Sequence, residues 1–135
     1  EKVEALKPQV ENDEYNTFMD LFADLMKAVT VHDLMTALEC GETMASLESR
    51  EKQKAFCNFA GDCIRKIFMV QQNMKHIAGL DSQEEEFFSR VAGQCGNAFC
   101  TRTIANIEKV VSLIDRNVNS KILFCDLVNR MFLSV

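Results

Sequence analysis

The sequence predicts an all-α fold, a single compact bundle of five or six helices stapled by disulfides. Three observations predict it. The 135 residues include one proline and five glycines, so long stretches contain no residue that would break a helix. Apolar side chains recur in steps of three and four, which is the spacing of one helix face. The six cysteines are a high and even number for this length, which is typical of a disulfide framework.

The N-terminal part divides into two regions. Residues 1–12 are polar and charged, and we expect them to lie loosely on the surface. Residues 13–135 are expected to form one helical domain. Asp13 is a candidate N-cap for its first helix. The apolar face of that helix is Tyr15, Phe18, Phe22, Leu25 and Val29.

The second helix has an uncertain C-terminal boundary. Thr30 followed by Asp33 has the pattern of a capping box and predicts its start. Gly41 leaves two possibilities open: the helix ends there, or it runs through to about Glu48.

The third helix carries the widest apolar stripe of the chain, from Phe56 to Ile77. A face this wide indicates a central helix covered by several neighbours. Gly79 is expected to end it in a left-handed conformation.

Three further helices complete the bundle. Ser82 with Glu85 predicts a capping box at the start of a fourth helix. Gly93 and Gly96 are expected to weaken the end of this helix. Thr101 or Thr103 is expected to cap a fifth helix. Residues 117–120 predict a turn before a last helix over residues 122–132.

The cysteine count also indicates a compartment. Three disulfides predict an oxidising, extracellular location, and a chain that starts with Glu1 fits a mature secreted protein. The alternative is six reduced thiols that pack as small apolar side chains in the cytosol.

Helix geometry restricts the pairing. Cys57 and Cys63 are six residues apart on one helix, which separates them by about 9 Å along the axis and prevents a bond. Cys95 and Cys100 fail the same test unless the neighbouring glycines break the helix. Positions at equal distance from a turn lie at the same height in an antiparallel helix pair. The predicted disulfides are therefore Cys40–Cys57, Cys63–Cys95 and, by elimination, Cys100–Cys125.

Charge and motifs exclude several classes of function. The net charge of −5 and the pI near 5.0 disfavour nucleic acids and anionic membranes as partners. The longest apolar run is four residues, Ile122 to Cys125, so we expect no transmembrane segment. No nucleophile motif, phosphate loop or metal-ligand spacing is visible. The sequence therefore predicts a protein that is not an enzyme and that has no cofactor or metal.

The apolar composition suggests a function. Ten phenylalanines and seven methionines are suited to irregular apolar space, and apolar pockets often lie between bundle helices. We therefore expect a secreted, non-enzymatic carrier of an apolar small molecule, such as a fatty acid or a similar lipid. The alternative is an extracellular ligand or effector bundle that binds a receptor or another protein through its surface.

The class, length and cysteine count resemble those of small, acidic, six-cysteine helical proteins such as the insect odorant-binding proteins. The resemblance implies a ligand carrier. The spacings between Cys57 and Cys63 and between Cys100 and Cys125 differ from the pattern of that family, so no residue role is carried over.

The predicted ligand pocket lies between the third helix and the helices that pack on it. Its expected lining is Phe22, Met26, Phe68, Met74, Phe88 and Met131. A polar head group would need a cation at the mouth of the pocket. The candidate anchors are Arg65, Lys66 and Lys75.

Overall fold

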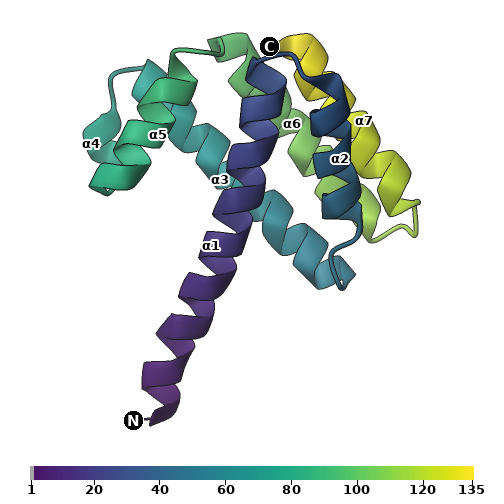
Figure 1. Cartoon of the computed structure of the whole chain (residues 1–135), viewed down its shortest axis with the longest axis horizontal. Helices are drawn as coiled ribbons and strands as arrows, with labels where there is room; N and C mark the ends of the chain where they lie inside the picture. The colour runs from purple at the N-terminus through teal and green to yellow at the C-terminus, as the bar shows by residue number, and fades with distance from the viewer. Residues whose placement is uncertain (1) are drawn as a thin grey trace.

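The chain folds as a series of consecutive α-helices (Figure 1). The computed structural model describes residues 2–135, and it describes the side chains of residues 13–76 and 78–135. This described part has six long helices, one short helical turn and no strand, so the all-α prediction is confirmed. The elements are α1 (Lys2–Thr30), α2 (Leu34–Ala45), α3 (Arg50–Gln71), α4 (Lys75–Ala78), α5 (Ser82–Ala92), α6 (Asn97–Ile114) and α7 (Ser120–Ser134).

The third helix lies at the centre of the arrangement. α3 packs most extensively against α6, and it also contacts α1, α2, α4 and α5. α2 packs against α1 and α7, and α7 also packs against α6. In Figure 1, α1 crosses in front of α3, with α2 and α7 on one side and α4 and α5 on the other. The wide apolar stripe of α3 is thus explained by its number of neighbours.

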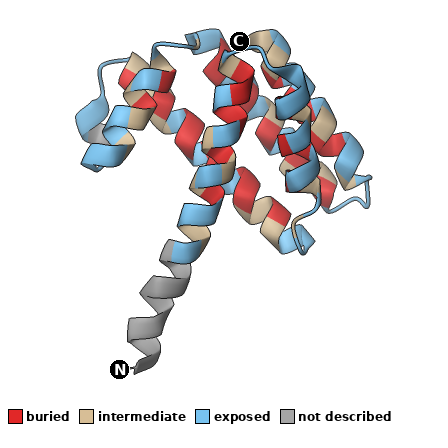
Figure 2. Cartoon of the chain, viewed as in Figure 1, coloured by how far each residue is buried: buried red, intermediate tan, exposed pale blue. Residues whose placement is uncertain are grey.

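The core is built around phenylalanine. The buried residues line the inner faces of the helices in Figure 2. Burying one such ring contributes about 1.5–3 kcal/mol. Five helices each contribute one fully buried ring, and these are Phe22, Phe56, Phe88, Phe99 and Phe124.

The first two helices differ from the prediction at their boundaries. Asp13 lies inside α1 and is not its N-cap, and Thr30 is the last residue of α1. Asp33 caps α2, because its carboxylate accepts the backbone N–H of Thr36 over 3.2 Å and the Thr36 hydroxyl over 2.7 Å. The expectation that residues 1–12 lie loosely on the surface concerns side chains that are outside the described residues.

α2 continues through Gly41, which decides between the two possibilities left open. Gly41 is buried where α2 meets α7. A Cβ atom there would be 3.2 Å from Val128 Cγ2 and 3.4 Å from the carbonyl oxygen of Phe124. The glycine therefore serves a close helix crossing and not a helix end.

α3 ends earlier than its apolar pattern predicts. Its last residue is Gln71, and Asn73 follows with φ of 61°, a left-handed conformation that asparagine tolerates. The expected left-handed glycine is present, since Gly79 has φ of 67°, but it closes the short α4. The side chain of Ile77 is outside the described residues, so the end of the predicted stripe is not tested.

The capping box of α5 is one residue earlier than predicted. The backbone N–H of Glu84 donates to Asp81 Oδ1 over 2.8 Å, and the N–H of Asp81 donates to Glu84 Oε1 over 3.2 Å. Asp81 is therefore the N-cap, and Ser82 is the first helical residue.

The last two helices begin at polar or flexible residues. α6 begins after Gly96, so Thr101 and Thr103 lie within the helix and are not its caps. Asn119 caps α7 by accepting the N–H of Ile122 over 3.2 Å, and this confirms the predicted turn.

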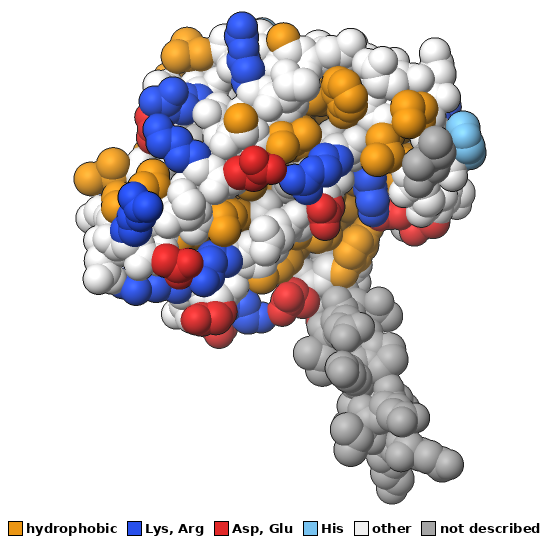
Figure 3. Space-filling view, turned by 180° about the vertical axis from the view of Figure 1, so that it is seen from behind, with side chains coloured by type: hydrophobic (Ala, Val, Ile, Leu, Met, Phe, Trp, Pro, Cys, Tyr) orange, Lys and Arg blue, Asp and Glu red, His pale blue; other side chains and the backbone are white. Residues whose placement is uncertain are grey.

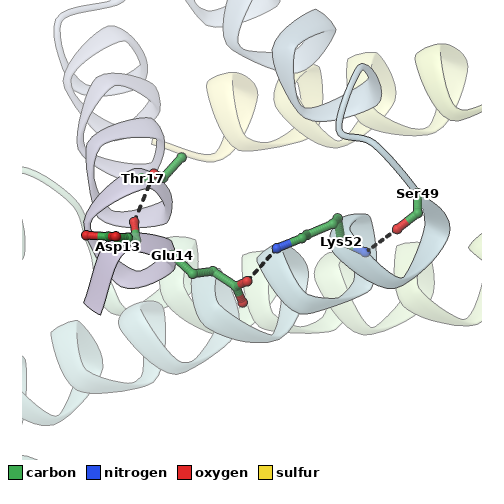
Figure 4. Close-up of polar contacts among 5 residues, drawn as sticks. All are labelled: Asp13, Glu14, Thr17, Ser49 and Lys52. Atoms are coloured by element: carbon green, nitrogen blue, oxygen red, sulfur yellow. Dashed lines mark hydrogen bonds and ion pairs between the residues drawn. The ribbon is translucent and has the colours of Figure 1, made fainter. Parts of the chain in front are cut away.

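Polar contacts between α1 and the start of α3 are drawn in Figure 4. Lys52 Nζ lies 2.5 Å from Glu14 Oε2, and the backbone N–H of Lys52 donates to the N-cap Ser49 over 3.2 Å. Exposed ion pairs contribute only about 0–1 kcal/mol. Phe18, whose ring meets Phe56 edge-on at 5.4 Å, therefore contributes more to the position of α1.

The predicted disulfide stapling is not supported. All six cysteines of the described chain are free, so none of the three expected pairs is bonded. The pairing assumed that consecutive helices pack side by side, but α2 lies mainly against α1 and α7 and has little contact with α3. Cys40 consequently lines a groove beside α1, while Cys57 lines a separate groove between α3 and α6.

Candidate functional site

The six residues predicted to line a pocket occupy different environments. Four of them are buried in one close-packed core cluster, and these are Phe22, Met26, Phe88 and Met131. Phe68 is half-buried against the same cluster, whereas Met74 is 37% exposed near the end of α3. The core thus brings five of the six together as packing partners and leaves Met74 at the surface.

The predicted anchors lie on the outside of the bundle. Arg65 contacts Asp62 over 3.0 Å and Glu108 over 3.2 Å, and it borders a small groove of about 140 Å³ between α3 and α6. Lys75 lies 3.5 Å from Glu85. Lys66 is half-buried on α3. Neither Arg65 nor Lys75 has its charge directed to the core cluster, because each contacts surface carboxylates.

A hollow with a volume of about 680 Å³ lies between α1 and α2. We call it the α1–α2 groove. Its residues are Thr17, Leu21, Asp24, Lys27, Ala28 and Val31 from α1 and its end, and Asp33, Thr36, Glu39, Cys40, Thr43 and Leu47 from α2 and its flanks. The turn at residues 31–33 makes the two helices antiparallel, so both walls run along the groove.

The floor of the α1–α2 groove is apolar. Ala28 and Cys40 are buried, and Leu21 and Leu47 are half-buried. Val31 stands at the end of the groove nearest the turn and is 60% exposed. An exposed apolar side chain beside an apolar floor is the composition of a contact surface.

The rim of the groove is acidic. Asp24, Asp33 and Glu39 contribute three carboxylates, and Lys27 contributes one ammonium group. Burial and the nearby carboxylates of Asp24 and Glu39 raise the pKa of the Cys40 thiol, so this thiol stays protonated in the floor. The groove therefore presents a negative field to any ligand.

The face seen from behind the view of Figure 1 is mixed in character. Figure 3 shows this face with separate apolar patches between charged side chains of both signs. Charged pairs also join α3 to α6, where Arg65 lies 3.2 Å from Glu108 and Lys54 lies 2.8 Å from the α6 C-cap Asp115. Mixed charge of this kind is ordinary for a solvated surface.

The α1–α2 groove is not evident from the sequence. Its signal in the sequence is faint: acidic residues at outward positions on both sides of the turn at residues 31–33. Such positions read as solvated helix faces. These acidic residues form one site only because α1 and α2 pack beside each other.

Comparisons with known proteins add no assignment. The chain matches no protein-family model, no curated protein and no solved structure. Within the described residues, no group of histidine, cysteine and acidic side chains is arranged to hold a metal ion. No described helix is both long enough and apolar enough to cross a membrane.

Proposed function

We propose that this chain is a non-enzymatic binding protein whose α1–α2 groove accepts a basic amphipathic helix of a partner protein. The observation that carries this proposal is the combination of an apolar floor and an acidic rim along two antiparallel helices. A helix that presents apolar anchors to such a groove and lysine or arginine to its rim matches both features.

The dimensions of the groove support a helical occupant. Its α1 wall covers residues 17–31, which is about 21 Å of helix at about 1.5 Å per residue. A partner helix of about four turns has this length. Helices packed side by side lie about 8–10 Å apart, so the axis of a partner helix in the groove would lie this far from α1 and from α2.

The charge of the rim favours a helix over a fatty acid. An anionic head group would meet three carboxylates and one lysine, and like charges disfavour binding. Five of the six side chains expected to line an internal pocket pack in or against the core cluster, and the sixth, Met74, is exposed. The small-molecule carrier is therefore the second candidate, and it is an outcome of the test below.

The test uses two labelled peptides of about 14 residues with the same apolar positions, one with lysine and one with glutamate at the polar positions. Fluorescence polarisation should show saturable, micromolar binding of the lysine peptide and no saturation with the glutamate peptide. A labelled fatty acid is the third probe. Saturable binding of the fatty acid alone would favour the carrier and overturn the helix proposal.

Two matched variants locate the binding. Thr43 in the groove and Thr101 on α6 are exposed helical threonines whose hydroxyls donate to their own helix. Thr43→Trp should fill the groove and weaken the lysine peptide at least about tenfold, a change of roughly 1.4 kcal/mol. Thr101→Trp should leave the affinity unchanged. Equal affinities of the two variants would contradict the proposal.

An extracellular location is proposed on the cysteine count alone. Immunodetection of the protein in the medium and in the lysate of its source cells tests this location. Its presence in the lysate only would contradict secretion, and the groove proposal does not depend on the result.

A further inference from the structure

The break between α5 and α6 brings two cysteines together. α5 ends at Ala92 and α6 begins at Asn97, so Cys95 lies in the connecting loop and Cys100 lies in the first turns of α6. An unbroken helix would hold residues five apart too far for a bond. In this arrangement both sulfur atoms contact the same side chain, the Gln71 carboxamide.

One carboxamide holds both thiols. Gln71 Nε2 donates to the carbonyl oxygen of Cys95 over 2.8 Å and lies 3.7 Å from Cys95 Sγ. Cys100 Sγ lies 3.5 Å from Gln71 Oε1. Gln71 Nε2 also donates to the carbonyl of Ala92 over 3.2 Å, which fixes the end of α5. The side chain at the end of α3 therefore sets the position of both sulfur atoms.

The two thiols are chemically unequal. Hydrogen bonds from Cys100 and Gln71 lower the pKa of Cys95 against the opposing effect of burial, whereas the interaction with Cys95 and burial raise the pKa of Cys100. Cys95 is half-buried and Cys100 is fully buried. Cys95 is thus the thiol that both ionises more readily and meets solvent, and these are the properties of a reactive cysteine.

We propose that Cys95 and Cys100 are a redox pair that forms a reversible disulfide within the chain, with Cys95 as the attacking thiol and Cys100 as the resolving thiol. The oxidant is a hydroperoxide, for which hydrogen peroxide is the probe. This site is independent of the α1–α2 groove.

The reaction balances in two steps. The Cys95 thiolate attacks one oxygen of hydrogen peroxide; an S–O bond forms, the O–O bond breaks, and hydroxide leaves and takes up the proton that Cys95 released. The Cys100 sulfur then attacks the sulfenic sulfur of Cys95; an S–S bond forms, the S–O bond breaks, and the proton of Cys100 leaves with the hydroxyl as water. Two thiols and one peroxide give one disulfide and two waters.

Cys57 and Cys63 are less suited to this chemistry. Burial raises the pKa of Cys57 and of Cys63 to about 12, so both stay protonated inside α3. They are six residues apart on one continuous helix and cannot bond to each other. They provide an internal control.

The chain offers a clean readout in a single digest. Cleavage after Arg90 and Arg102 releases residues 91–102, which contain Cys95 and Cys100 and no other cysteine. Cleavage after Lys54 and Arg65 releases residues 55–65, which contain Cys57 and Cys63. The full-length folded protein is treated with hydrogen peroxide at one equivalent. It is then unfolded in guanidinium chloride, so that buried thiols can react, and blocked with N-ethylmaleimide. The blocked chain is digested with trypsin and weighed by mass spectrometry.

The expected result is that fragment 91–102 loses two hydrogens and takes up no maleimide, while fragment 55–65 carries two maleimides. Dithiothreitol before blocking should restore two maleimides on fragment 91–102. A fragment 91–102 that stays doubly alkylated would overturn the proposal. Equal oxidation of both fragments, or a disulfide from Cys95 to Cys125, would overturn it as well.

Three variants assign the roles. Cys100→Ser should leave Cys95 as a sulfenic acid that dimedone traps, and Cys95→Ser should leave Cys100 as a thiol. Gln71→Leu removes the hydrogen bonds to both sulfurs, so the alkylation rate of Cys95 near neutral pH should fall about tenfold. Its pH profile should also move to higher pH, a change that a purely structural role of Gln71 would not produce. An unchanged pH profile would exclude Gln71 as a positioning residue.

Discussion

The hydroxyl of Tyr15 on α1 donates a hydrogen bond to Glu84 Oε2 on α5 over 2.5 Å. Glu84 is also the third residue of the capping box with Asp81. One carboxylate therefore closes the N-terminus of α5 and holds that helix against α1. The contact joins residues that are 69 positions apart in the sequence.

This contact predicts how stability depends on alkaline pH. The pKa of Tyr15 is raised above its usual value of about 10, mainly by burial. The hydrogen bond to Glu84 and the negative charge of Glu84 raise it further. The folded state then holds the proton more tightly than the unfolded state. The stability from Tyr15 is fully present below about pH 10 and is lost as the pH rises above it. Tyr15→Phe should remove this part of the alkaline loss.

The chain has one tyrosine and no tryptophan, so tyrosinate absorbance measures Tyr15 alone. Its titration midpoint should be higher in the native protein than in the urea-unfolded chain. Glu84→Gln should move the native midpoint down without reaching the unfolded value, because burial remains. Identical midpoints for native and unfolded protein would contradict the prediction.

A pair of isoleucines tests the position of the core. Ile67 on α3 is fully buried, and Ile122 on α7 is 66% exposed. Ile67→Ala should lower the free energy of unfolding by about 2–5 kcal/mol, and Ile122→Ala should change it by less than about 0.5 kcal/mol. Urea unfolding measures both. Similar losses for the two variants would mean that α3 is not central.

Two glycines test the helix crossing between α2 and α7. A Cβ at Gly61 would meet Ile107 Cγ2 at 3.8 Å, which is an ordinary contact. Gly61→Ala should therefore stabilise the protein by about 0.5–1 kcal/mol through helix propensity. Gly41→Ala should stabilise less or destabilise, because its Cβ would lie 3.2 Å from Val128 Cγ2. The melting temperature of each variant measures this difference. Equal changes in melting temperature, relative to the unsubstituted protein, would argue against the close crossing of α2 and α7.

A buried glutamine links three helices. Gln53 on α3 donates to the carbonyl oxygen of Ala45 over 3.1 Å, and the Ser120 hydroxyl donates to its Oε1 over 3.2 Å. Gln53→Leu should cost about 1–3 kcal/mol, because it removes two hydrogen bonds of a buried side chain and leaves two partly buried partners unpaired. Gln83→Leu at an exposed position of α5 is the control. Chemical denaturation that shows no difference between them would contradict the prediction.

The sequence predicted the helices themselves because their periodicity is local. It placed several boundaries wrongly because caps depend on which side chain reaches a backbone N–H, as Asp33 does and Thr30 does not. Neighbouring helices were not predictable: the disulfide hypothesis paired Cys40 with Cys57, whereas α2 packs mainly on α1 and α7. The α1–α2 groove was missed because no single helix contains it.

The contacts of α5 also determine which part of the native protein unfolds locally. α5 packs mainly on α3. It also meets α1, where the ring centroids of Phe22 and Phe87 are 6.3 Å apart. By contrast, α6 packs against both α3 and α7. Amide hydrogens of residues 82–92 are therefore expected to exchange with solvent together, through an opening that costs less than global unfolding. Cys95 follows this segment directly. Transient release of α5 would expose the thiol pair to small molecules while the rest of the bundle stays folded.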